Sequence, residues 1–561
     1  MTSFRSITTA ILSIGIVLSA SATKTITVRP PKGDATSTLA KALRKASDAG
    51  GPVVIKLEPG IYNFSTGKAT PRHFRCSNTA AEYEHPDDIK HIGLFLHGLK
   101  DITIDGNSQA TLLSHGEMTL WTIDSCTNVT IKGLTIDAAD PTVTEMTVTS
   151  RTDTTFTAQV HPKSRYEIRN GKLYWLGEGW EFTGGIAQIH QPDKETTTRC
   201  AHPFEAATDI RETGPGILRF SFDKAPDCRP GDTYQIRHSL RNELPGFINR
   251  SVGVKLENIK YAYLGNFGLL SQFSTDLTFS NVDCSPIEGS GRTNAGFADF
   301  FHFSGCRGKL KIDHCNFSGS QDDGINVHGT HMKITGIDNN RLTLRYMHPQ
   351  TFGFLGFTPG DTIAITDPMT LLHAYKATVS DARMTDPYTT EITISPLTPV
   401  GQPQTDAAAL EGLVVENLSW CPEVEVTNCR FAYLPTRGIL MTTHRPVRIT
   451  DNEFIKCPLP AILIADDARS WFESGPVTDV LIARNRFIDC STPAISISPE
   501  AIPSSEMVHS NIRIIDNTFI SPSPVTISAF SVNGLTVKNN RFLTPDGNPQ
   551  KSILETLNVS E

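Results

Sequence analysis

The chain has 561 residues, 39% of them hydrophobic, so it is long enough to bury a large core. Its 41 glycines and 35 prolines favour a turn-rich β protein over a helical one. The formal net charge of −8 gives no sign of a nucleic-acid partner or an anionic membrane partner, and it argues against a polyanionic substrate such as pectate, which a basic groove would bind.

The N-terminus is typical of a secretory signal peptide. Arg5 precedes an apolar run from Ala10 to Ala20, and an Ala-Ser-Ala cleavage sequence ends at Ala22. The run is too short to span a bilayer comfortably, and no other stretch is long and apolar enough to do so. We therefore predict that residues 1–22 are a signal peptide, that the mature protein has no membrane segment, and that it is exported to a periplasm or beyond.

A short phrase recurs through the chain, most clearly in its C-terminal third. Each copy has an alternating β segment, a turn residue and a second short β segment, and the last five copies end in phenylalanines 23, 33, 32 and 23 residues apart. A period of this size is typical of a solenoid. We predict an all-β protein whose residues 23–141, 242–332 and 406–561 form a right-handed parallel β-helix. Asparagine at the recurring bend suits a left-handed backbone conformation and a ladder of hydrogen bonds between coils. The copies are 128–136, 276–282, 309–317, 423–431, 446–454, 479–487, 511–519 and 534–542.

Two stretches, residues 142–241 and 333–405, lack the repeated phrase. Both contain hairpin-like alternation and the sequence Pro-Gly-Asp-Thr, which begins at Pro230 in the first stretch and at Pro359 in the second. We predict that they are two related small β-barrels inserted into loops of the β-helix. The second begins just after His331, so we expect it to stand beside the acidic residues described below and to help wall a pocket. A pocket suits an enzyme that removes one terminal sugar.

Eleven cysteines would suit disulfide bonds in an exported protein, but their positions argue otherwise. Several recur at or near the turn of the repeated phrase, where a stacked and buried thiol acts as a small apolar residue. The odd total also leaves at least one cysteine unpaired. We predict mostly free, buried cysteines, with Cys200 and Cys228 as a candidate pair. The recurring cysteines are Cys315, Cys429, Cys457 and Cys490.

Three carboxylates form the strongest candidate for a catalytic site. Asp299 precedes the adjacent pair Asp322 and Asp323 by about one repeat. Neighbouring like charges raise at least one pKa, which keeps a carboxylic acid protonated beside an ionised partner, as acid/base hydrolysis requires. Adjacent residues of a strand face opposite sides, so we expect a bulge or bend to bring all three together. The alternative is that Asp322 only caps a turn before Gly324.

Polar residues around these aspartates are candidates for substrate binding. His302, Asn326, His328 and His331 lie within a few residues of the acidic positions. They could bind sugar hydroxyls or simply stack at a corner of the coil, and the ring of a nearby tryptophan could stack on a sugar. We predict no metal, because His-Gly-Thr-His is not a recognised ligand spacing. Further candidates in loops of neighbouring coils are Arg292, Arg437, His444 and Trp420.

With these motifs the chain resembles glycoside hydrolase family 110, secreted bacterial exo-α-1,3-galactosidases that act on blood-group-B-type and linear α-1,3-galactosyl glycans. The resemblance covers nearly the whole mature chain, through residues 85–95, 295–303, 321–329 and both predicted barrels. More distantly, one Asp followed by Gln-Asp-Asp resembles the polygalacturonases of family 28. Both families invert configuration. The resemblance implies that Asp322 is the general acid, that Asp299 and Asp323 activate water, and that no cofactor is needed.

The leading hypothesis is therefore an exo-acting, inverting hydrolase of terminal α-1,3-linked D-galactose with a glycan as its partner. One alternative is another β-helix enzyme, either a polygalacturonase-like hydrolase or a lyase, although a lyase would use a Lys or Arg base that the acidic trio lacks. Another is a non-catalytic glycan-binding β-helix, which would have no reason to gather three carboxylates. The need for a neighbouring fucose and the oligomeric state are left open by the sequence.

Overall fold

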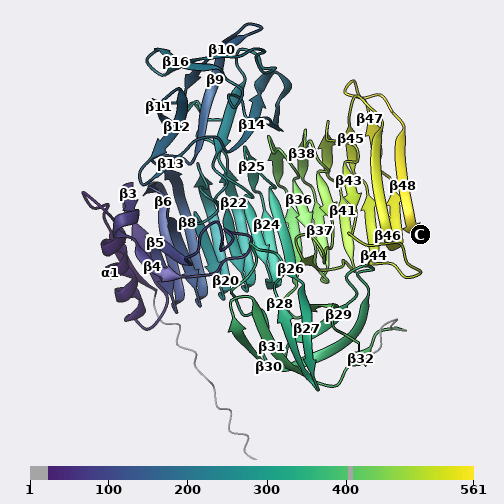
Figure 1. The fold of residues 1–561 in the computed structure, drawn as a ribbon. Helices are drawn as coiled ribbons and strands as arrows, with labels where there is room; N and C mark the ends of the chain where they lie inside the picture. The colour runs from purple at the N-terminus through teal and green to yellow at the C-terminus, as the bar shows by residue number, and fades with distance from the viewer. Residues whose placement is uncertain (1–22, 402–408, 561) are drawn as a thin grey trace, which may run out of the picture.

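The computed structural model describes residues 23–401 and 409–560. The predicted signal peptide, residues 1–22, lies outside the described residues. Strands dominate the described chain, and its one α-helix, α1 (Thr36–Ser47), packs against the first coil at the N-terminal end (Figure 1). No helix in these described ranges is long and apolar enough to cross a membrane.

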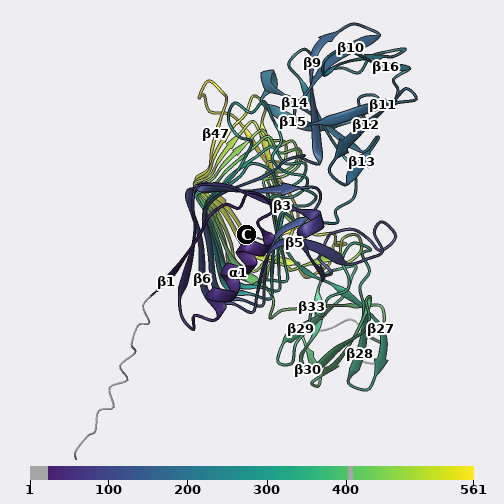
Figure 2. The ribbon, with the colours of Figure 1, turned by 90° about the vertical axis from the view of Figure 1, so that its left-hand side faces the viewer.

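The main domain is a parallel β-helix whose coils run from the N-terminal helix to the C-terminus (Figures 1 and 2). Each coil adds a strand to three stacks, which the chain visits in a constant order, and four long strands bend from the first stack into the second. The first stack contains β1 (Lys24–Val28), β2 (Val53–Leu57), the first parts of β6 (Lys100–His115), β8 (Thr127–Ala138), β20 (Val252–Tyr261) and β22 (Thr275–Cys284), then β24 (Arg307–Asp313), β34 (Pro422–Thr427), β37 (Val447–Thr450), β41 (Val480–Ala483), β44 (His509–Ile515) and the end of β46 (Val525–Lys538).

The other two stacks complete each coil. The second contains β3 (Gly60–Ser65), the second parts of the four long strands, β25 (Asn316–Ser318), β35 (Arg430–Ala432), β38 (Glu453–Ile455), β42 (Arg486–Ile488), β45 (Thr518–Ile520) and β47 (Arg541–Leu543). The third contains β5 (Ile89–His97), β7 (Thr119–Asp124), β19 (Gly246–Asn249), β21 (Leu269–Gln272), β23 (Phe301–Ser304), β26 (Ile325–Thr330), β36 (Ile439–Met441), β39 (Ile462–Ile464), β43 (Ile495–Ile497), the start of β46 and β48 (Ser552–Val559).

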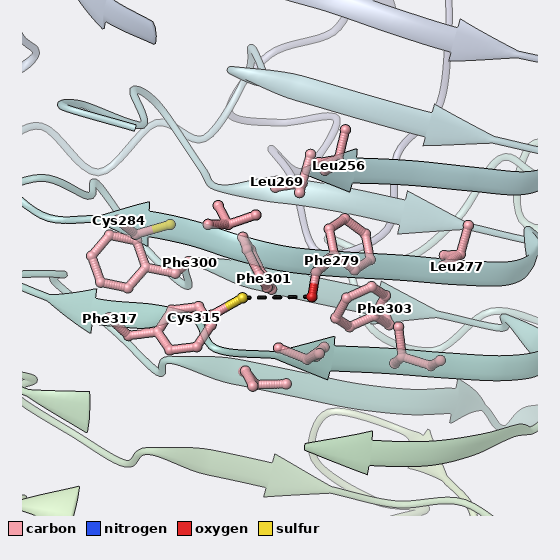
Figure 3. Packing of buried hydrophobic residues seen from close by; sticks show 14 of the residues in the cluster. Leu256, Leu269, Leu277, Phe279, Cys284, Phe300, Phe301, Phe303, Cys315 and Phe317 are labelled. Carbon is pink, nitrogen blue, oxygen red and sulfur yellow. Dashed lines mark hydrogen bonds between the residues drawn. The ribbon is translucent and has the colours of Figure 1, made fainter. Parts of the chain in front are cut away.

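Apolar side chains of the repeated phrase fill the interior of the coils, as the alternation predicts. One phenylalanine per coil stacks on the next, with ring centroids 4.6–5.0 Å apart. Further rings and cysteines fill the middle coils, where the Cys315 thiol donates to the carbonyl of Phe279 at 3.6 Å (Figure 3). The stacked rings belong to Phe317, Phe431, Phe454, Phe487, Phe519 and Phe542.

An asparagine ladder runs along the last coils and confirms the predicted hydrogen bonds between repeats. The Nδ2 group of each ladder residue donates to Oδ1 of the next at 3.0 Å. The left-handed backbone, however, belongs to the residue before each ladder position, for example Asp451 at φ 61° and Arg484 at φ 56°. The preceding residue makes the bend, so the ladder side chain can point inward. The ladder consists of Asn452, Asn485, Asn517 and Asn540.

All eleven cysteines are free, as most were predicted to be. The candidate pair Cys200 and Cys228 is not bonded, and this part of the prediction is wrong. Both thiols pack in the apolar core of the first insertion, where burial raises the pKa of Cys200 to about 12. These cysteines act as apolar core residues instead of a covalent link.

The first insertion, called barrel I, leaves the β-helix between β8 and β19. Its antiparallel sheet has seven strands in the order β15-β14-β18-β9-β10-β17-β16, beside a three-stranded sheet. The seven strands are β9 (Val143–Arg151), β10 (Thr155–Val160), β14 (Ile186–Gln191), β15 (Thr196–Cys200), β16 (Asp209–Gly214), β17 (Ile217–Ser221) and β18 (Thr233–Arg237), and the three are β11 (Arg165–Arg169), β12 (Lys172–Gly177) and β13 (Trp180–Phe182).

The second insertion, called barrel II, leaves the β-helix between β26 and β34 and closes as a ring of six strands. Its last strand, β33 (Val414–Asn417), pairs with β27 and β29 to close the ring, so barrel II ends at Asn417 and not at residue 405 as predicted. The other strands are β27 (Met332–Asp338), β28 (Arg341–Arg345), β29 (Thr362–Thr366), β30 (His373–Asp386) and β31 (Thr389–Ile394), with β32 (Thr398–Pro399) at one edge.

The two insertions border the third stack from its two ends (Figure 2). Barrel I interrupts the turn that leads into this stack, and barrel II interrupts the turn that leaves it. The predicted catalytic aspartates precede β23 and β26, so they occupy turns equivalent to the one that carries barrel I. The third stack is therefore the face on which residues from the β-helix and both insertions meet.

Candidate active site

In three successive coils, the equivalent position before the third-stack strand is occupied by Asp299, Asp323 and Arg437. Asp299, Asp323 and Arg437 each lie two residues before a strand residue of the third stack, and those strand residues pair with one another. The N–H of Asp323 donates to Oδ1 of Asp299, and the N–H of Arg437 donates to Oδ1 of Asp323, both at 3.1 Å. The coil neighbour of Asp299 is thus Asp323, and Asp322 lies one residue out of this register. Gly268 lies beneath Asp299, where a Cβ would collide with the Asp299 carbonyl.

Asp322 lies in a bend before β26, which confirms the predicted departure from a regular strand. Its side chain is 17% exposed, compared with 8% for Asp299 and 4% for Asp323. Arg199 of barrel I donates to its Oδ1 and Arg241 to its Oδ2, each at 3.1 Å. All three aspartates bring an oxygen within 4.8 Å of the others. The bend therefore directs the most exposed of the three carboxylates toward two guanidinium groups.

Two of the three aspartates have raised pKa values. Burial raises the pKa of Asp299 to about 7, with a further contribution from the charge of Asp322. Burial also raises the pKa of Asp323 to about 7, although the Arg437 guanidinium, 3.1 Å from Oδ2, opposes the rise. The raised pKa values thus fall on the two aspartates that the resemblance assigns to water activation.

Two buried histidines connect Asp299 with a fourth carboxylate. Nδ1 of His302 lies 2.8 Å from Oδ2 of Asp299, and its Nε2 lies 2.8 Å from Nε2 of His328. His328 is also 3.6 Å from Oε1 of Glu473, which stands on β40 (Glu473–Ser474) beside the end of β26. Both histidine side chains are 1% exposed. Their ring nitrogens contact Asp299, the Gly329 carbonyl and each other, so neither histidine has a free nitrogen for a sugar, and their predicted role in substrate binding is corrected.

Comparisons with known proteins agree with this architecture. Residues 144–233 match the GLAA-B beta-barrel domain I model, residues 341–407 match beta-barrel domain II, and residues 408–542 match the right handed beta helix region model. Alpha-1,3-galactosidase A of Bacteroides thetaiotaomicron is 42% identical over 543 residues, which is 96% of this chain and 94% of that protein. The chain belongs to glycoside hydrolase family 110. The resemblance predicted from its motifs is confirmed, as is the predicted right-handed β-helix with two inserted barrels.

More divergent relatives carry the same kind of name. Alpha-1,3-galactosidase A of Akkermansia muciniphila is 35% identical over 502 residues, which is 88% of this chain and 82% of that protein. Alpha-1,3-galactosidase B of Bacteroides thetaiotaomicron is 32% identical over 504 residues, which is 86% of this chain and 79% of that protein. In each case the similarity spans the β-helix and both insertions, so this family 110 chain is a glycoside hydrolase.

The structure places several of the predicted substrate-binding residues elsewhere. Arg292 is 4% exposed and pairs with Glu145 of barrel I at 3.2 Å, so it belongs to the junction between barrel I and the β-helix. His331 is fully buried against Asp466. Trp420 is half-buried between Arg307, at 4.2 Å from its ring centroid, and Phe273, at 5.6 Å, and it packs against the core of barrel II, so it belongs to the junction of that barrel. The predicted binding roles of these three residues are therefore corrected.

Of the remaining candidates, Arg437 and Asn326 stay close to the acidic trio and His444 does not. Arg437 is 27% exposed and contacts both oxygens of Asp323, at 3.1 and 3.4 Å. Asn326 pairs in register with His302 on the neighbouring strand and is 5% exposed. His444 donates to Glu416 of barrel II at 2.9 Å, away from the trio. Of the candidates in loops of neighbouring coils, Arg437 alone touches an aspartate of the trio among the contacts of the described residues.

The sequence analysis gave no signal for four residues at or near the site, which are Arg199, Arg241, Trp471 and Glu473. Arg199 and Arg241 reach Asp322 from barrel I and from the segment that follows it, 123 and 81 residues away in the chain. Trp471, 44% exposed, stacks on His348 of barrel II with ring centroids 4.3 Å apart, two residues before Glu473. Barrel II borders the same face, and the charged contacts with Asp322 come from barrel I and from the segment that follows it.

Within residues 23–401 and 409–560, two clusters have three possible metal ligands whose atoms lie within 4.8 Å of one another. One is the aspartate trio, whose oxygens already accept bonds from arginines and backbone N–H groups. The other joins barrel II to the β-helix, where Glu416 accepts from His373 at 2.5 Å and from His444 at 2.9 Å. Every group in these clusters has a hydrogen-bond partner, so we assign a metal to neither.

Proposed function

We propose that this family 110 enzyme removes terminal α-1,3-linked D-galactose from blood-group-B-type glycans and from linear α-1,3-galactosyl glycans, with inversion of configuration. The observation that carries the proposal is the aspartate trio, in which a partly exposed carboxylate stands beside two buried ones at the junction of the β-helix and barrel I. Relatives up to 42% identical over nearly the whole chain are named alpha-1,3-galactosidase, which supports the linkage and the sugar.

The roles of the aspartates follow from their positions. Asp322, the most exposed, protonates the glycosidic oxygen as the bond to C1 of galactose breaks. A water molecule attacks C1 and gives its proton to the buried pair Asp299 and Asp323. Arg199 and Arg241 must release Asp322 when the leaving group arrives, since they occupy both of its oxygens in the free site. Barrels I and II border this face and support attack at a chain end.

The spacing of the carboxylates does not by itself favour inversion. Inverting enzymes usually hold acid and base roughly 6.5–9.5 Å apart, and retaining enzymes roughly 5–5.5 Å. Oxygens of this trio approach within 4.8 Å. The support for inversion is the family resemblance, in which one aspartate is the acid and two others hold the water.

The first experiment follows the products from an α-1,3-linked galactosyl disaccharide by proton NMR. We expect free galactose that is the β anomer at the earliest times, because a single displacement inverts C1. Initial α-galactose would show a covalent intermediate and contradict inversion. Galacturonate release from pectin, or no sugar release from either substrate, would favour the polygalacturonase-like or the non-catalytic alternative. A parallel assay with the fucosylated B-type trisaccharide compares branched with linear substrates.

Trp471 is our candidate platform for the sugar that follows galactose. Its ring is 44% exposed, and Asp467 accepts the backbone N–H groups of residues 469–472 and so holds the loop in place. Trp471→Ala is expected to raise KM for the disaccharide by roughly 3- to 10-fold, which corresponds to about 0.5–1.5 kcal/mol for an aromatic contact. Trp471→Phe keeps a ring and serves as the matched control. An unchanged KM in Trp471→Ala would place the sugar elsewhere.

A further inference from the structure

The contacts of the two buried histidines determine where their protons lie. Nδ1 of His328 is 2.6 Å from the Gly329 carbonyl, and a carbonyl only accepts, so this nitrogen carries a proton. With His328 neutral, its Nε2 is an acceptor, and Nε2 of His302 must donate across the 2.8 Å contact. Nδ1 of a neutral His302 then has only a lone pair to offer Asp299. The Oδ2 atom of Asp299 must therefore carry the proton in this contact.

The same chain of contacts offers a route for that proton. We propose that His302 and His328 are positioning residues that relay the proton of Asp299 toward Glu473 and so prepare Asp299 to accept a proton from water; this inference rests on the proposed function. The O–H bond of Asp299 breaks as an Nδ1–H bond forms on His302. The Nε2–H bond of His302 breaks as an Nε2–H bond forms on His328.

The transfer conserves protons and leaves a stable arrangement. Asp299 becomes a carboxylate, His302 remains neutral with its proton on Nδ1, and His328 becomes an imidazolium. Nδ1 of His302 then donates to the new carboxylate, so the contact persists in the opposite direction. No proton enters or leaves the group formed by Asp299, His302 and His328. Its total charge inside the protein therefore stays the same, which avoids the free-energy cost of burying an additional charge.

Charges around the relay favour this direction. Oε1 of Glu473 lies 3.6 Å from Nε2 of His328, and Asn78 holds the same oxygen at 3.0 Å, so a negative group faces the nitrogen that receives the proton. Burial and the neighbouring His328 lower the pKa of His302 well below its usual value. The proton therefore passes through His302 and does not rest there. Asp322 and Arg241 also act on His302, with opposite signs.

Asparagine substitutions can cut the relay while keeping the local contacts. Asn at position 302 retains a side-chain oxygen that can accept from protonated Asp299, and Asn at position 328 retains an N–H group for the Gly329 carbonyl, but neither side chain reaches the other position. We expect His302→Asn and His328→Asn each to lower kcat for the disaccharide by roughly 10- to 100-fold, with KM within about threefold. The double variant should be no slower than the slower single variant, because both substitutions interrupt the same proton path.

His331→Asn is the matched control. It also removes a buried imidazole at the end of β26, but its partner is Asp466, outside the relay, so kcat should stay within about twofold of the wild type. Two results would overturn the relay: wild-type kcat in His302→Asn, or losses that multiply in the double variant. Either would show that the histidines act only through their separate local contacts.

A second measurement needs no substrate. In the full chain labelled with ¹⁵N-histidine, Asp299→Asn should displace the ring ¹⁵N resonances of His328, because the asparagine removes the proton that enters the relay. The relay predicts that this displacement disappears in the His302→Asn background. A displacement that persists unchanged would come from charge acting through space and would contradict the relay. Because this test does not depend on activity, failure of the relay can be told apart from failure of the galactosidase proposal.

Discussion

Asp322→Asn is expected to slow hydrolysis of the natural disaccharide by roughly 10²–10⁴-fold but to slow an activated aryl α-galactoside far less. An alkoxide leaving group needs a proton as the C1–O bond breaks, whereas an acidic phenol departs without one. Asp322 is the aspartate with the most exposed carboxylate, which suits contact with the leaving group. The measurement is kcat/KM for both substrates, with circular dichroism to confirm that the variant folds.

The two buried aspartates provide the comparison for this experiment. Asp299→Asn and Asp323→Asn remove groups that accept the proton of water, so each should slow both substrates alike, by roughly 10²–10⁴-fold. Azide should partly restore them, because an anion can replace the water. The reverse pattern, with leaving-group dependence in Asp299→Asn and equal losses in Asp322→Asn, would exchange the roles. Unchanged activity in all three variants would show that the site itself is wrong.

Such a reversal would have a physical basis. The raised pKa values belong to Asp299 and Asp323, and a general acid must hold its proton at the working pH. Arg199 and Arg241 both bind Asp322 in the free site, and they must move before it can protonate a sugar. The leaving-group experiment therefore decides between the family-based assignment and one in which a buried aspartate is the acid.

Phe487→Ala is expected to lower the free energy of unfolding by about 3–5 kcal/mol. The Phe487 ring is 1% exposed and stacks between Phe454 at 5.0 Å and Phe519 at 4.6 Å. Removing it leaves a cavity in the middle of a column of parallel rings, where neighbouring coils are tied by the asparagine ladder and cannot collapse into the gap. Urea denaturation followed by circular dichroism measures the change through the midpoint and slope.

Arg486→Ala is the control for the stability experiment. Arg486 precedes Phe487 on the same strand, and its side chain is 54% exposed, so its removal should change stability by no more than about 0.5 kcal/mol. A loss below about 1 kcal/mol in Phe487→Ala would contradict a rigid column and would mean that the coils close around the missing ring. The folded variant should keep its kcat, since β42 is separated from Asp323 by intervening coils.

The sequence by itself determined the β-helix and predicted that Asp299, Asp322 and Asp323 lie together. Alternation with a period of two residues directs one set of side chains inward, and a phenylalanine in each copy must then meet its counterpart in the next coil. Asp299 and Asp322 are separated by about one repeat, so any parallel stacking of coils brings them close. Local patterns and one regular period were sufficient for these conclusions.

Only the tertiary structure decided which atoms meet within that cluster. The turn between coils sets the register, and its shape places Asp323, not Asp322, opposite Asp299. The same register places His302 and His328 as a connected pair on the outer face of the third stack, next to Asp299. A shift of one residue reverses the face of a strand side chain, and a repeat pattern with variable turn lengths does not specify the register to one residue.

The contributions of the insertions were also beyond the sequence. Arg199, Arg241 and His348 come from barrels or adjoining segments that do not follow the coil period, so their positions depend on how each insertion docks. Docking is set by contacts such as the buried Arg237 guanidinium on Gln321, which join residues 84 positions apart. Such contacts arise from packing of whole domains, whereas the period of the coil acts only between neighbouring repeats.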